Sequence, residues 1–72
     1  MPYVVEIKRA RDDMAKAMEA IREWLDVHRF EPDAFRSMTV LDKIVFKLEF
    51  KIEREASACA GAFDGRLIVP GG

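Results

Sequence analysis

The sequence predicts one small α+β domain over residues 1–72, and two periodicities carry that prediction. Tyr3–Lys8 and Ile44–Ile52 alternate apolar with polar or charged residues, which is the pattern of β-strands with one buried face. Met14–Arg29 instead places an apolar residue at every third or fourth position, the spacing of one helix face. Residues 70–72 read Pro-Gly-Gly and are expected to be a disordered tail.

The first strand is predicted over Tyr3–Lys8, where β-branched residues recur on alternate positions. Asp12 or Asp13 is expected to cap the next helix, because a short carboxylate accepts hydrogen bonds from the free amides of a first turn. That helix is predicted from Met14 to about Arg29. Glu31-Pro32 is expected to end it, because the residue before a proline avoids the helical region.

Two strands are predicted in the middle of the chain. Ala34–Val40 alternates weakly and is interpreted as a strand, with Leu41-Asp42 as the turn that follows. Ile44–Ile52 alternates large apolar residues with charged ones, so one of its faces is expected to be buried and the other exposed to water.

A second helix is predicted from about Glu53, because alanine favours helices over strands and the glutamates suit a helix start. Gly65 is expected to take the left-handed position that ends this helix, and Arg66–Val69 is predicted as a short last strand. One face of this helix is expected to be buried, and it holds Ala56, Cys59, Ala60 and Phe63.

The resulting order of elements is β-α-β-β-α-β, which is the ferredoxin-like, split βαβ arrangement of a two-layer sandwich. Both helices are then expected on one face of an antiparallel sheet whose other face is open. The first and third strands become central neighbours, which would bring Glu6 near Lys47 or Lys51. An arrangement of this kind hosts many unrelated functions, so it does not identify one.

Composition excludes several classes of function. The chain has 12 basic and 13 acidic side chains, balanced in both halves, and the expected open face lacks aromatic residues. We therefore expect no nucleic-acid binding. No apolar run is long enough to cross a bilayer and no signal peptide is recognised, so we expect no membrane association. The single cysteine fits the reducing cytoplasm, where we expect the protein to be.

The inventory of chemically active residues is poor, and we predict that the protein is not an enzyme. His28, the only histidine, lies at the end of the apolar helix face and is interpreted as a boundary residue. Cys59 lies on the buried face of the second helix and is interpreted as a core thiol, although the pattern leaves a reactive thiol open. We predict no catalytic residue, no metal site and no cofactor.

What remains is an interaction module, and we expect it to bind a protein partner or to form a homodimer. Ala34–Val40 has a single charge, so as an edge strand it would be open to pairing with another chain. The residues predicted to contact the partner are Phe30, Phe35, Arg36 and Met38. The alternative is a small-ligand sensor or an accessory subunit of an enzyme, with the ligand at a dimer seam or between the first helix and the sheet.

Overall fold

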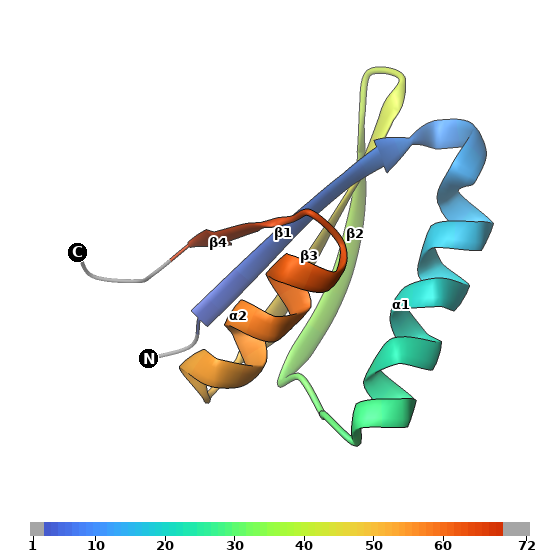
Figure 1. The fold of residues 1–72 in the computed structure, drawn as a ribbon. Helices are drawn as coiled ribbons and strands as arrows, with labels where there is room; N and C mark the ends of the chain where they lie inside the picture. Colours follow the sequence, from blue (N-terminus) through green and yellow to red (C-terminus); the bar gives the residue numbers. More distant parts are fainter. Residues whose placement is uncertain (1–2, 69–72) are drawn as a thin grey trace.

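A computed structural model describes residues 3–68 of the chain (Figure 1). It confirms an α+β fold in which a four-stranded antiparallel sheet packs against two helices. Val69 and residues 70–72, expected as the strand end and the tail, lie outside the described residues. The elements are β1 (Tyr3–Ala10), the 3₁₀ turn η1 (Arg11–Asp13), α1 (Met14–His28), β2 (Ala34–Val40), β3 (Lys43–Phe50), α2 (Glu53–Ala62) and β4 (Arg66–Ile68).

The sheet has the strand order β2-β3-β1-β4, and its centre is the pair of β1 with β3. These two strands pair along their whole length, from Tyr3 opposite Phe50 to Ala10 opposite Lys43. Glu6 lies directly opposite Lys47, as the sequence predicts, whereas its ion pair is with Lys8 on its own strand, at 3.8 Å.

The core lies between one face of this sheet and the two helices, as Figure 1 shows. Alternate residues of β1 and β3 point into it, and both helices contribute to the same buried cluster. Full burial of a large apolar side chain contributes about 1.5–3 kcal/mol, so the alternation fixes which face turns inward. The fully buried large side chains are Val5, Ile7, Ile21, Ile44, Phe46, Leu48, Phe50 and Cys59.

The ends of α1 differ from the prediction. Asp12 and Asp13 lie in the 3₁₀ turn, and Asp13 at the helix N-cap makes no side-chain hydrogen bond to the backbone. The helix ends before Glu31-Pro32, because Arg29 takes a left-handed conformation (φ 57°) and its N–H bonds back to Asp26 and Leu25. Thus a local backbone reversal at Arg29 ends the helix before the chain reaches the proline.

Strand β3 is shorter at its end than the alternation indicates. It stops at Phe50, and Ile52, expected on the buried face, is 48% exposed at the N-cap of α2. Lys51 also lies beyond the strand, and it pairs with Asp33 at 3.8 Å. The start of α2 therefore ends the strand before Ile52, because a chain that enters a helix leaves the plane of the sheet.

At the end of α2, Asp64 and Gly65 have roles that differ from those predicted from the sequence. Asp64, and not Gly65, takes the left-handed conformation (φ 54°). The N–H of Gly65 bonds to the carbonyl of Ala60 at 2.7 Å, and that of Phe63 to Cys59, which closes the helix. Gly65 is needed for another reason. A Cβ there would lie 2.9 Å from both the carbonyl oxygen of Glu6 and a side-chain carbon of Ile7.

This close approach generates a paired prediction. Gly65→Ala should destabilise the fold by about 1–3 kcal/mol, because β1 backbone must move to admit the new methyl group. Gly61→Ala should stabilise it by about 1 kcal/mol, since that position is helical and has open space around it. Urea unfolding of both variants measures the two shifts. Equal midpoints for Gly65→Ala and the parent would contradict the packing role of Gly65.

Candidate functional site

Strand β2 forms one edge of the sheet, and one side of its backbone has no neighbouring strand within residues 3–68. On the other side, all seven of its residues pair with β3. Only Arg36 is charged in it, and from Arg36 to Val40 every residue is exposed. Even Ser37 and Thr39, which share the helix-side face with Phe35, are exposed, so the helices leave this part of β2 uncovered.

The hydrogen-bond phase shows which groups of β2 are free. The N–H of Arg11 bonds to the carbonyl of Asp42 at 3.1 Å, which extends the β1–β3 ladder by one step. Bonded pairs alternate along antiparallel strands, so Lys43, Val45 and Lys47 turn their backbone groups toward β2. The Glu49 carbonyl, which accepts from Asp33, agrees with this phase.

It follows that alternate β2 residues differ in role. Those opposite Val45 and Lys47, namely Met38 and Arg36, bond to β3 through their backbone. Phe35, Ser37 and Thr39 direct their N–H and C=O groups toward the free edge. The free edge therefore presents three residues whose backbone groups face away from the sheet.

The four residues predicted for partner binding do not form one patch. Phe35 is half-buried on the helix side, with its ring 6.1 Å from that of Phe46. Phe30 is also half-buried, and its ring lies 5.5 Å from that of Trp24. Arg36 and Met38 are exposed on the opposite, open face of the sheet. Within β2, strand alternation separates Phe35 from Arg36 and Met38, whereas Phe30 precedes the strand and packs on Trp24 of α1.

The hairpin tip adds an apolar residue that the sequence analysis treated only as a turn. Leu41 is 89% exposed and has a positive φ of 57°. A left-handed conformation costs a residue with a side chain roughly 1–2 kcal/mol, and glycine or asparagine usually takes such positions. Next to it, Val40 is 47% and Met38 49% exposed. The tip and outer half of β2 therefore display apolar surface at some conformational cost.

The open face of the sheet carries an excess of positive charge that the balanced sequence hides. Register and alternation place five basic side chains on it, but only the two acidic residues Glu6 and Glu49. The remaining charged groups of the chain are thus net acidic. The fold itself separates the charges. The five basic residues are Lys8, Arg36, Lys43, Lys47 and Arg66.

Arg36 and Lys47 are direct register partners across β2 and β3. Like charges directly opposite one another destabilise a sheet, and neither residue has an ion-pair partner among the described residues. They border a hollow of about 370 Å³ whose other lining residues are Val4, Glu49 and Ile68. This hollow therefore combines two cations and one carboxylate with aliphatic walls.

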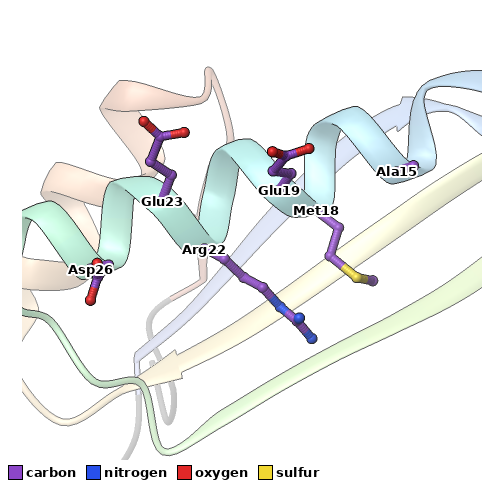
Figure 2. A pocket seen from close by; sticks show the side chains of 6 residues that line it. All are labelled: Ala15, Met18, Glu19, Arg22, Glu23 and Asp26. Atoms are coloured by element: carbon purple, nitrogen blue, oxygen red, sulfur yellow. The ribbon is translucent and has the colours of Figure 1, made fainter.

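A larger hollow, of about 620 Å³, lies along α1 (Figure 2). Figure 2 shows Met18 and Arg22 extending from one side of the helix and Glu19 and Glu23 from another. Every residue that lines it belongs to α1, so it is an open helix surface and not a cleft between elements. Its lining residues are Ala15, Met18, Glu19, Arg22, Glu23 and Asp26.

Between α1 and the end of α2 lies a third hollow, of about 350 Å³. Ala17, Ile21 and Phe63 give it apolar walls, and Arg9 lies at its border. The Arg9 guanidinium donates to the carbonyls of Phe63 and, at 2.7 Å, of Lys8. Arg9 thereby connects β1 to the end of α2, and two of its donors are already used within the chain.

His28 is part of an aromatic cluster that the sequence analysis missed. Its ring lies 4.4 Å from that of Trp24, and its Nδ1–H donates to the Trp24 carbonyl at 2.9 Å. Trp24 also meets Phe30 and, at 5.8 Å, Phe63 of the α2 end. The four-residue spacing of Trp24 and His28 along α1 could have predicted their contact. The contact of Trp24 with Phe63 is visible only in the tertiary structure. His28 is thus a boundary residue at the C-terminal end of α1, as the sequence predicts.

Cys59 is a core residue with no exposed surface. Burial raises the pKa of its thiol from 9.0 to about 11, because the thiolate would lose its hydration. The thiol therefore stays protonated at neutral pH and lacks the nucleophilic form that a reactive cysteine needs. Among residues 3–68, no three histidine, cysteine or acidic side chains are grouped so that they could hold a metal ion.

Comparison with known proteins gives no further guide to the site, since no family model, curated protein or solved structure matches the chain. Within the described residues, neither helix is long and apolar enough to span a bilayer.

The pKa of Cys59 generates a prediction for stability. The unfolded thiol loses its proton near pH 9.0 and the folded one near 11, so the folded state binds more protons between these values. The free energy of unfolding should therefore fall in that interval, by at most about 1.4 kcal/mol per pH unit. Cys59→Ala should lack this component. Urea unfolding across the interval compares the two proteins, and parallel pH curves would contradict the effect of burial.

Proposed function

We propose that this protein is a non-enzymatic interaction module that forms a homodimer through β2. The free edge of β2 is the observation that carries this proposal, because Phe35, Ser37 and Thr39 leave backbone donors and acceptors unpaired within residues 3–68. Exposed edges are normally blocked by charge, proline or short length, and this strand has seven residues and one charge. Pairing with a second copy would satisfy the free groups.

The positions of the outward-facing backbone groups along β2 favour one register for the dimer. A two-fold axis at Ser37 pairs Ser37 with its own copy, and Phe35 with Thr39 of the other copy. All three are residues whose backbone groups point outward, so this register makes the largest set of hydrogen bonds around one axis. The two sheets then join into one, with their helix-covered sides on the same face.

The same register gives the hairpin tip a partner. Leu41 of one copy falls opposite Asp33 of the other, beside the connection that begins at Phe30. An exposed apolar side chain held in a costly conformation suggests a contact role. Burial of Leu41 against the connection of the second copy would offset the conformational cost. Phe35, on the helix side, and Arg36 and Met38, on the open side, would then lie along the seam, whereas Phe30 would stay against Trp24 of its own copy.

A proline at Ser37 tests this proposal. Its N–H points away from β3, so Ser37→Pro should leave the monomer folded, as proline is tolerated where the N–H faces outward on an edge strand. The dimer should weaken roughly thirtyfold, because each copy loses a backbone hydrogen bond worth about 1 kcal/mol. Light scattering after size-exclusion chromatography over a range of concentrations measures the mass, and circular dichroism checks the fold.

Two controls accompany this experiment. Ser37→Ala keeps the backbone N–H and should keep the dimer. Met38→Pro should lower the stability of the monomer instead, because the N–H of Met38 is directed at β3. A parent protein that is monomeric at every concentration, or a Ser37→Pro protein that dimerises as the parent does, would refute the pairing of β2.

A small-ligand sensor or accessory subunit is the second candidate, and the hollow beside Arg9 and Phe63 favours it. Its apolar walls suit a small ligand. Arg9 already serves two backbone carbonyls, and the other polar residues at this hollow are Asp13 and Lys16. We rank this candidate below self-association, because one acidic and two basic side chains do not select a class of ligand. For the architecture, we propose the ferredoxin-like arrangement, which the succession β-α-β-β-α-β supports.

A further inference from the structure

We propose that the open face of the sheet docks an acidic protein segment in an extended conformation, with its carboxylates on Arg36 and Lys47. This inference does not depend on the dimer, because one copy carries the whole site. The face bears five basic and two acidic side chains on a chain that is net acidic overall. Complementary charge would speed association with an acidic partner.

The pair Arg36 and Lys47 gives the face its centre. The strand register fixes these two cations opposite each other, and neither takes part in an ion pair within the described residues. Two carboxylates lie nearby. Glu6 is opposite Lys47 but pairs with Lys8 at 3.8 Å, and Glu49 lines the same hollow. A carboxylate placed between Arg36 and Lys47 would relieve their repulsion, so the bound state gains more there than a carboxylate gains on a single surface cation.

Aliphatic side chains beside the cations favour a polypeptide over a nucleic acid. Val4 and Ile68 line the hollow that Arg36 and Lys47 border, and Met38 and Val40 extend the apolar surface on β2. None of the described side chains on this face is aromatic, so bases would find no ring to stack on. An extended segment turns every second residue to the same side, so acidic and apolar residues two positions apart would reach the cations and the aliphatic side chains together.

A second copy docked through its own open face is disfavoured, because two faces with the same excess charge repel each other. The partner is therefore an extended acidic segment and not a second open face. Its carboxylates and aliphatic side chains occupy alternate residues, so that both lie on the side that meets the sheet.

The test uses a short synthetic peptide that repeats Glu-Ser-Val-Ser, so that glutamate and valine share one side of the extended chain. It is labelled for fluorescence anisotropy at low ionic strength. Matched peptides replace glutamate with glutamine or with lysine. The full-length protein should bind the glutamate peptide only, and rising salt should weaken that binding. The double variant Arg36→Gln/Lys47→Gln should bind it roughly tenfold less tightly.

The control variant Lys16→Gln/Arg22→Gln removes the same charge from α1, where both side chains are exposed. It should change the affinity less than about twofold, because its charges lie on another element. Equal losses in the two double variants, or no binding of the glutamate peptide, would overturn the proposal. Tighter binding of single-stranded polyuridylate would assign the face to nucleic acid. Salt-sensitive self-association that Arg36→Gln/Lys47→Gln abolishes and Ser37→Pro does not would assign the face to another copy of this chain.

Discussion

The antiparallel ladder between β1 and β3 is the interaction on which the rest of the structure depends. Each strand has eight residues, and they pair from end to end. Their alternation sends one set of side chains into the core with both helices and the other set to the open face. The same ladder fixes the hydrogen-bond phase of β3 and, through it, the phase of β2. Core, charged face and free edge are thus consequences of one register.

The sequence predicts much of this because the relevant signals are local. Alternation in β1 and β3 and the helical spacing of α1 locate three elements, and the bounds of β2 are predicted without error. The predictions are wrong at the helix ends, where backbone hydrogen bonding, conformational preference and packing compete over a few residues. Arg29 and Asp64 take left-handed conformations that sequence preference assigns to glycine or asparagine, because helix closure there satisfies backbone carbonyls. Gly65 is instead required by its packing against β1.

The candidate site is less predictable than the fold, since it depends on which strands become neighbours. Composition shows balanced charge, whereas the register places Arg36 opposite Lys47 and collects cations on one face. Likewise, the four residues predicted for partner binding are close in sequence. Alternation places Phe35 on one side of the sheet and Arg36 and Met38 on the other, and Phe30 packs on Trp24 before the strand begins. A single sequence indicates that β2 lacks blocking charges. It does not indicate which of its backbone groups face outward.

The central claim is that alternate residues of β2 differ in the direction of their backbone groups and that the outward set pairs with a second copy. Residue-resolved amide hydrogen exchange of the parent protein, at low and at high concentration, tests both parts together. Met38 and Val40 should be protected at both concentrations, whereas Ser37 and Thr39 should become protected only at the higher one. Exchange at Ser37 and Thr39 that is equally fast at both concentrations would contradict the account, as would unprotected amides at Met38 and Val40.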